Sequence, residues 1–167
     1  SYELPSFMGA LDQMTATLER RERQLDILED LLADKQLEDQ TYLSGRPLTK
    51  GWMSSRFGRR SDPFSGRVAW HKGVAFAGKE GTPIVATGAG VVTYSGERSG
   101  YGKMVEINHG NGLSTRYGHA KELLVEPGEI VRTGDVVGKV GSSGRSTGPH
   151  VHYEVLKNGA QVNPQPY

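Results

Sequence analysis

The sequence predicts a mainly β protein, with a small antiparallel β-sandwich preceded by a long N-terminal α-helix that forms a stalk. Residues 4–39 carry a helical pattern of apolar side chains, and the composition changes near residue 44. The chain has 23 glycines among 167 residues, about twice the usual ~7%. From residue 51 onward, short apolar runs alternate with these glycines, as in many short strands joined by turns. We therefore expect two parts, a helical, coiled-coil-like stalk at 1–44 and a β domain at 45–167.

The helix is predicted from Leu4 to about Asp39, where apolar residues recur at alternating steps of three and four. This is the spacing of a heptad seam, and only Arg21 interrupts it. At 1.5 Å per residue such a helix extends roughly 54 Å. Gly45 and Pro47 supply the expected stop. The seam consists of Leu4, Phe7, Leu11, Met14, Leu18, Leu25, Leu28 and Leu32, and Ile27 and Leu31 widen it.

A helix of this length cannot bury its apolar stripe against itself. The stripe therefore packs on the following domain, pairs in a coiled coil through self-association, or docks on a regulatory partner protein. A membrane-surface helix has less support, because the polar face mixes acids with bases, as in residues 19–23, and lacks a basic bias.

The β domain is predicted from short runs rich in β-branched and aromatic residues. Closely spaced strands with no intervening helical period indicate an antiparallel sandwich or barrel, and argue against a βαβ fold. The sequence His109-Gly110-Asn111-Gly112 is a strong hairpin-turn signal between two of these runs. The predicted strands are 68–70, 73–77, 83–86, 90–95, 104–108, 113–117, 136–140 and 151–156.

Composition excludes several classes of protein. With 20 Lys and Arg against 19 Asp and Glu, the formal charge of +1 provides no general attraction for nucleic acid. The absence of cysteine excludes disulfides and Cys-ligated metal sites. No apolar run approaches the ~20 residues that span a bilayer. The chain begins with Ser1 and no secretory signal precedes it, so we expect a mature form or a trimmed piece.

Histidines are the candidate functional residues, and all five lie in the predicted β domain. His150 and His152 are two residues apart, so in a strand they share one face, with Cα atoms about 6.6 Å apart. One imidazole can then hold a metal while the other reaches a water on that metal. Taken alone, the pair is a weak signal and is more typical of ordinary surface histidines than of a metal or catalytic site.

His71 and His119 strengthen the case for a metal site. His71 is expected in an extended segment in which positions 71, 73 and 75 share a face, and Gly73 leaves room for a metal. His119 ends another predicted strand, and neutral imidazole is a standard zinc ligand. His109, in the hairpin turn, is expected to be structural or solvated.

Several motifs occur in the order found in one known family. Residues 51–164 resemble the LytM/lysostaphin-type zinc metallopeptidases, which cut peptide cross-links in bacterial peptidoglycan. The motifs that carry this resemblance are Ser55-Arg56-Phe57-Gly58-Arg59-Arg60, His71-Lys72-Gly73-Val74-Ala75-Phe76-Ala77, Gly81-Thr82-Pro83-Ile84-Val85-Ala86, Thr115-Arg116-Tyr117-Gly118-His119 and Gly148-Pro149-His150-Val151-His152-Tyr153-Glu154.

The resemblance implies a LytM-like sandwich, built on a duplicated hybrid motif, with a narrow groove. Carried over by position, Zn²⁺ is held by His71, residue 75 and His152. His119 and His150 are the catalytic histidines that orient and deprotonate the attacking water and stabilise the oxyanion. The implied substrate is the peptide stems of peptidoglycan. The implied location is the bacterial cell envelope, in the periplasm, with anchoring through an N-terminal segment outside this sequence.

The sequence departs from the family pattern at one ligand position, where Ala75 replaces the expected aspartate. A methyl group cannot bind zinc, and a catalytic zinc site normally has three protein ligands. We therefore expect weak zinc binding and an impaired or inactive endopeptidase.

Two explanations of Ala75 remain open. One is an inactivating substitution in a competent enzyme, and the other is a natural non-catalytic module that binds peptidoglycan or regulates another wall hydrolase. A third ligand from another residue or a water is a further possibility. Arg56, Arg59, Arg60 and Arg145 are candidates to contact acidic groups of a peptide stem, with solvated surface as the alternative.

Overall fold

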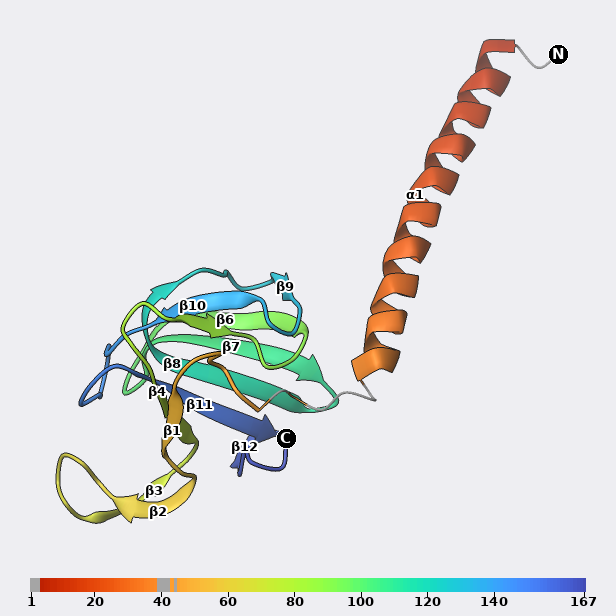
Figure 1. Ribbon diagram of the computed structural model, residues 1–167. Helices are drawn as coiled ribbons and strands as arrows, with labels where there is room; N and C mark the ends of the chain where they lie inside the picture. The colour runs from red at the N-terminus through yellow and green to blue at the C-terminus, as the bar shows by residue number, and fades with distance from the viewer. Residues whose placement is uncertain (1–3, 39–42, 44) are drawn as a thin grey trace. The chain divides into compact units, whose positions relative to one another are not determined.

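The computed structural model describes residues 4–38, 43 and 45–167. Internal contacts divide the chain into two units, Ser1–Thr41 and Tyr42–Tyr167. The predicted fold class is confirmed, because a single long helix is followed by a domain of antiparallel strands (Figure 1). We describe each unit by itself.

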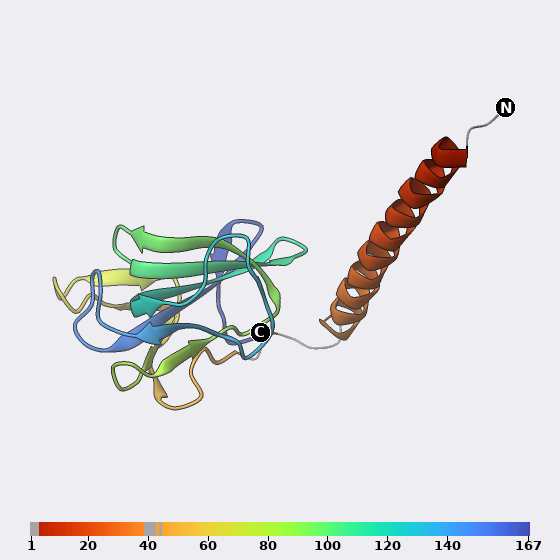
Figure 2. The same ribbon diagram turned by 90° about the horizontal axis from the view of Figure 1, so that it is seen from above.

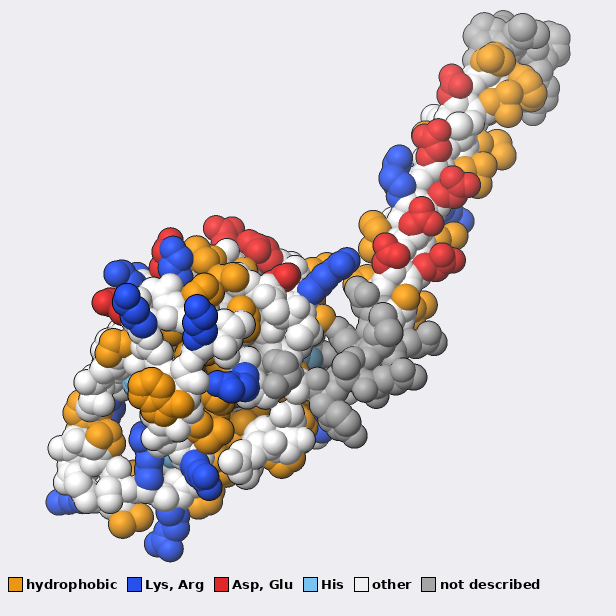
Figure 3. Space-filling view, viewed as in Figure 1, with side chains coloured by type: hydrophobic (Ala, Val, Ile, Leu, Met, Phe, Trp, Pro, Cys, Tyr) orange, Lys and Arg blue, Asp and Glu red, His pale blue; other side chains and the backbone are white. Residues whose placement is uncertain are grey.

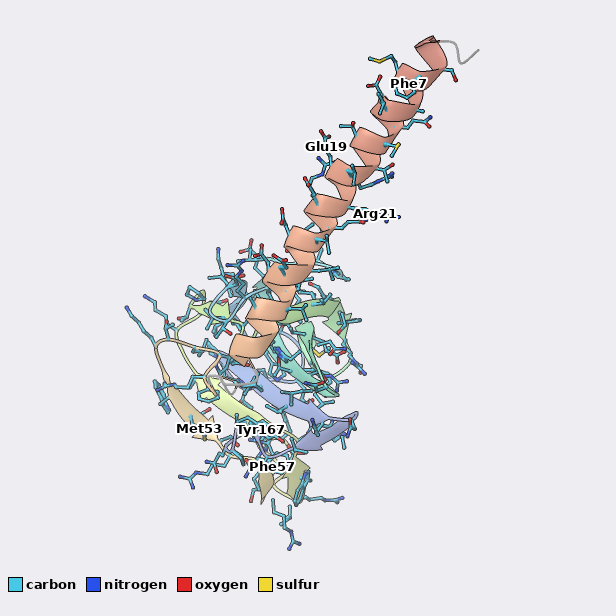
Figure 4. All side chains as sticks on the ribbon, turned by 90° about the vertical axis from the view of Figure 1, so that its right-hand side faces the viewer. Phe7, Glu19, Arg21, Met53, Phe57 and Tyr167 are labelled. Atoms are coloured by element: carbon cyan, nitrogen blue, oxygen red, sulfur yellow. The ribbon has the colours of Figure 1, made fainter. Side chains whose placement is uncertain are left out.

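The N-terminal unit contains helix α1 (Leu4–Glu38). Orange apolar side chains follow the helix between red and blue charged ones (Figure 3), and Glu19 and Arg21 project from opposite sides (Figure 4). The predicted last residue, Asp39, and the side chain of Leu4 lie outside the described residues. No described helix is long and apolar enough to cross a membrane. The exposed large apolar side chains of the helix are Phe7, Met8, Leu11, Met14, Leu18, Leu25, Ile27, Leu28, Leu31 and Leu32.

The second unit is a folded antiparallel sheet whose neighbouring strands can be followed by colour in Figures 1 and 2. Its main path runs β1 (Trp52–Ser55), β4 (Val74–Ala77), β11 (His150–Lys157), β8 (Leu113–Leu123), β7 (Gly102–Gly110), β6 (Gly90–Arg98) and β9 (Ile130–Val131). Beside this path, β10 (Val136–Val140) pairs with β5 (Pro83–Val85) and β8, and β12 (Ala160–Val162) pairs with β11. A separate hairpin joins β2 (Gly58–Ser61) and β3 (Val68–His71).

Strand β8 connects the two halves of the folded sheet. Its first part pairs with β11, whereas its end pairs with β10, and the register with β7 shifts between these parts. His119 lies at this irregularity with φ of +62°, a left-handed conformation that is uncommon for a residue other than glycine. The backbone N–H of His119 donates to the carbonyl of Tyr101 at 2.7 Å, which fixes the bend. The strand therefore changes direction at a histidine of the predicted site.

The core of the β domain is built from buried valines, aromatic residues and a small hydroxyl network. Tyr117 and Tyr153 are almost fully buried, and both of their hydroxyls meet the hydroxyl of Thr87, at 3.0 and 2.9 Å. Buried hydroxyls need such partners because leaving them unpaired costs free energy. This network ties β8 and β11 together beneath the groove described below.

The predicted hairpin turn is confirmed, with Asn111 at φ of +52° and Gly112 at +75° between β7 and β8. Positive φ at both central residues is the pattern of a type I′ turn, which the Asn-Gly sequence favours. Strands β1, β2, β9 and β12, which have two to four residues each, were not predicted from the sequence. Strands this short show too little alternation for a periodic pattern to stand out.

Candidate metal centre and catalytic groove

A cavity of about 900 Å³ opens on the β domain, and four of the five histidines line it. His150 and His152 come from the start of β11, His71 ends β3, and His119 lies at the bend of β8. The predicted pairing of His150 and His152 on one face of a strand is consistent with this, because both line the same cavity. The structure thus brings together the four predicted site histidines from three strands.

His109 lies outside this group. Its Nδ1 is 2.7 Å from the carbonyl of Ala89, and its Nε2 is 2.7 Å from the hydroxyl of Thr115. Both ring nitrogens are therefore used in hydrogen bonds within the domain, as a structural role requires.

The nitrogens of His71 and His152 face each other. Nδ1–H of His71 donates to the carbonyl of Arg56 at 2.8 Å, and Nε2–H of His152 donates to the carboxylate of Glu154 at 2.9 Å. When both rings are neutral, each has only one N–H, and these bonds then leave lone pairs on Nε2 of His71 and Nδ1 of His152. The two atoms lie 3.2 Å apart. At this distance the two nitrogens can share one proton in a hydrogen bond, or they can bind one metal ion together.

This spacing fits a zinc ion. Zinc binds histidine nitrogen at about 2.0–2.1 Å in a tetrahedral arrangement, which places two ligand nitrogens about 3.3 Å apart. The third donor is missing, because the described residues include no group of three His, Cys, Asp or Glu side chains able to hold a metal. Ala75 pairs with His152 across β4 and β11 and lines the cavity. The chain therefore presents two nitrogen ligands beside a methyl group.

His119 and His150 form the second pair, with ring centroids 4.7 Å apart. Nδ1–H of His119 donates to the carbonyl of Ser143 at 2.7 Å, and Nδ1–H of His150 donates to that of Gly148 at 2.8 Å. Nε2 of each neutral ring is then free to accept a proton. Two oriented proton acceptors in one groove are suited to general base and acid catalysis.

Burial keeps three of these histidines neutral. It lowers the pKa of His71 and of His119 to about 4, with smaller contributions from neighbouring imidazoles. Burial also lowers the pKa of His150. Neutral rings are required both for a metal ligand and for a proton acceptor.

These lowered pKa values predict that the domain is destabilised by acid. Between pH 6.5 and about 4, the histidines are protonated in the unfolded chain and neutral in the folded one. The unfolded state then binds more protons, so the free energy of unfolding falls as the pH drops through this window and is recovered above it. Thermal melts from pH 7.5 to 4.5 measure this, and His119→Gln should flatten the dependence. A melting temperature independent of pH between 6.5 and 5 would contradict it.

Glu154 orients His152, a role that was not predicted from the sequence. Glu154 is buried in β11 and accepts hydrogen bonds from His152 and from the hydroxyl of Tyr101, each at 2.9 Å. Burial alone would raise its pKa, but the bond from His152 and the nearby Arg116 hold that pKa below its usual value. A carboxylate behind a ligating histidine fixes the ring and increases its basicity. Glu154 follows His152 by two residues in the same strand, so the two side chains share a face, and this spacing was the signal that could have predicted their contact.

The space beside Gly73 serves a different purpose from the one predicted. A Cβ at Gly73 would lie 2.3 Å from the carbonyl of Tyr153 and 2.9 Å from Cγ of Glu154. The missing side chain therefore lets the chain approach β11 and makes room for Glu154, instead of for a metal. Residues 71 and 75 also do not share one extended strand, because β3 ends at His71 and β4 begins at Val74. The prediction of a common extended face was wrong.

This combination of a folded antiparallel sheet and a histidine-lined groove defines a LytM-type peptidase domain. The family model described as peptidase family M23 matches residues 69–164, and the chain belongs to this family.

Three known proteins illustrate the similarity. DD-carboxypeptidase/endopeptidase Mpg of Neisseria meningitidis is 43% identical over 130 residues, 78% of this chain and 30% of Mpg. Peptidoglycan DD-endopeptidase ShyC of Vibrio cholerae is 42% identical over 120 residues, 71% of this chain and 28% of ShyC. A crystal structure of a zinc-containing peptidase from Vibrio cholerae is 34% identical with a TM-score of 0.69, covering 74% of this chain and 39% of that one. The chain thus spans under a third of both curated relatives.

Proposed function

We propose that this chain carries the catalytic domain of a zinc-dependent endopeptidase for peptidoglycan cross-links, with activity lost or impaired through Ala75. The observation that carries the proposal is the 3.2 Å approach of Nε2 of His71 and Nδ1 of His152, beside the methyl of Ala75. Relatives named as a peptidoglycan endopeptidase and a zinc-containing peptidase support the substrate and the metal.

The residues of the groove suit amide hydrolysis. When bound, a zinc ion supplies Lewis acidity, which polarises the scissile carbonyl and lowers the pKa of the attacking water. His71 and His152 would hold the metal, with the backbone carbonyl of Arg56 and the carboxylate of Glu154 fixing their rings. His119 and His150 orient the attacking water, and one of them accepts its proton, stabilises the oxyanion in its protonated form, and returns that proton to the leaving amine.

A second candidate function is a non-catalytic module that binds peptidoglycan or regulates another wall hydrolase. Ala75 is the observation that favours it, since a groove with two metal ligands can still recognise a peptide. In both cases the proposed location is the periplasm of the bacterial envelope, with anchoring through an N-terminal segment outside this sequence.

Digestion of purified peptidoglycan sacculi distinguishes these functions. The chain and its Ala75→Asp variant are incubated with sacculi and zinc, and released fragments are identified by mass. Soluble fragments cut at peptide cross-links, released only by the variant, would support a silenced endopeptidase. Inactivity of both proteins, with zinc retained by the variant and sacculi still bound, would favour the binding module.

The exposed apolar side chains of α1 lead to a separate prediction about self-association or partner binding. A heptad seam is stable only when another surface covers it. If the helix restricts access to the groove, deletion of residues 1–44 should raise activity. If the helix mediates dimerisation, the same deletion should abolish oligomers. Light scattering gives the mass, and fragment release in the Ala75→Asp background gives the activity. Equal mass and equal activity with and without these residues would count against both roles of the helix.

A further inference from the structure

An ion pair crosses the rim of the groove. Arg145 belongs to the glycine-rich loop before β11, and Asp62 belongs to the turn between β2 and β3. Nη2 of Arg145 lies 2.7 Å from Oδ2 of Asp62, and its guanidinium lies over the ring of Phe64, 4.6 Å from the centroid. Both partners also line the cavity that contains the four histidines. The pair therefore joins the two walls of the groove through side chains alone.

The two partners differ in how firmly they are held. Asp62 is fixed in its turn, because its Oδ1 accepts a hydrogen bond from the backbone N–H of Phe64 at 2.9 Å. Its backbone N–H also donates to the carbonyl of Arg67, and its carbonyl accepts from the N–H of Gly66. Arg145 reaches the pair with a long side chain that is 57% exposed, against 19% for Asp62. An exposed ion pair is worth little, because water and salt screen it. The guanidinium can therefore exchange one carboxylate for another without loss of the fold.

The charges of the cavity favour an anionic ligand. Its acidic side chains are already engaged, Asp62 by Arg145 and Glu154 by His152 and Arg116. Arg60 and Lys72 also line the cavity, and neither forms an ion pair within the described part of the chain. A concave site with excess positive charge attracts anions and raises their local concentration.

The position of Arg145 relates it to the reaction. The next residue, Ser146, places its hydroxyl 3.1 Å from Nδ1 of His150 and donates it to the carbonyl of Gly148 at 2.7 Å. A peptide lying in the groove against His150 thus passes beside Arg145. Guanidinium groups recognise carboxylates through paired N–H donors, which gives orientation as well as attraction.

We propose that Arg145 is a specificity-determining residue that binds a free carboxylate of the substrate peptide near the bond to be cut, and that Asp62 occupies its place until the peptide arrives. The inference rests on the proposed function, since it assigns the substrate of the same groove. Substrate binding breaks the Asp62–Arg145 pair and forms a new pair between Arg145 and the peptide. The enzyme then prefers anionic peptides over neutral ones of equal length.

Equilibrium binding tests this directly. The chain with Ala75 is used without metal in the presence of a chelator, so that the ligand is not consumed. The probes are a purified cross-linked peptide dimer from peptidoglycan and the same dimer with its free carboxylates converted to amides. We expect the acid form to bind about 3- to 10-fold more tightly, the range for a partly exposed charge-assisted hydrogen bond. The preference should shrink as salt is raised.

Two variants and a matched control identify the residues. Arg145→Gln should make the two dimers bind equally, by weakening only the acid form. Asp62→Asn should strengthen binding of the acid form, because it removes the competing carboxylate. Arg132→Gln removes the same charge from an exposed position between β9 and β10, outside the cavity, and should leave the preference unchanged. Melting curves confirm that each variant is folded.

The outcomes separate this inference from the proposed function. Equal affinity for both dimers in the unsubstituted chain, or a preference that survives Arg145→Gln, would overturn the role of Arg145 and leave the endopeptidase proposal standing. If neither dimer bound the unsubstituted chain or any variant, both would be overturned. Weaker binding of the acid form by Asp62→Asn would overturn the assignment of Asp62 as a placeholder.

Discussion

Ala75→Asp is expected to increase the zinc affinity of the chain by at least 10- to 100-fold. Losing a residue that only supports a ligand already costs 10–100-fold in metal affinity, and a missing ligand should cost at least as much. The new carboxylate would extend from β4 into the cavity, opposite His152 in the register of β4 and β11. Two nitrogens and one oxygen then complete the usual three-ligand set, with a position left open. Competition with a chromogenic chelator measures the change.

Ala77→Asp is the matched control for this experiment. Ala77 lies two residues along the same strand, also lines the cavity, and pairs with His150 instead of His152. The Ala77→Asp variant adds the same charge to the groove without adding a metal ligand beside the facing nitrogens of His71 and His152. An increase in zinc affinity equal to that of Ala75→Asp would show that charge alone was responsible and would contradict the third-ligand position.

In the Ala75→Asp background, replacement of either histidine that we propose to be catalytic should abolish most of the activity. We expect His119→Ala and His150→Ala each to lower kcat by about 10²- to 10⁴-fold, the usual contribution of a positioned acid or base. Zinc content should be unchanged, because neither Nε2 takes part in the facing pair formed by His71 and His152. Fragment release from sacculi and metal analysis give the two readouts.

His109→Gln serves as the control for the loss of a histidine. Its ring bonds Ala89 and Thr115 outside the groove, so the variant should melt at a lower temperature and keep its kcat. Loss of zinc together with activity in His119→Ala would instead place His119 among the ligands. Full activity in both His119→Ala and His150→Ala would exclude the proposed proton transfer.

Long or strongly patterned elements could be predicted from the sequence. The helix was evident from its three-and-four spacing, and the β7–β8 hairpin from Asn111 and Gly112, because both signals are local. Strands such as β9 and β12 could not be found, since two or three residues carry no period and their pairing is decided by the rest of the sheet. The bend between His71 and Val74 was missed for the same reason. Nothing in the local sequence distinguishes a bend from a continuous strand there.

The site histidines could be proposed from order and spacing, but their surroundings could not. The partners that fix their rings are backbone carbonyls, such as those of Arg56 and Ser143, which carry no residue-type signal. The role of Gly73 was also predicted wrongly. A glycine in the sequence indicates that a side chain is absent, but it does not show which neighbouring residue occupies the space. Asp62 and Arg145 are 83 residues apart, and only the fold brings them together.

Diffraction at the zinc absorption edge, on crystals of the Ala75→Asp variant grown with one equivalent of zinc, tests the central claim most directly. The account predicts a single strong anomalous peak in the groove, about 2.0–2.1 Å from both Nε2 of His71 and Nδ1 of His152. A groove without a peak, or a peak bound by only one of these two nitrogens, would contradict a shared metal site.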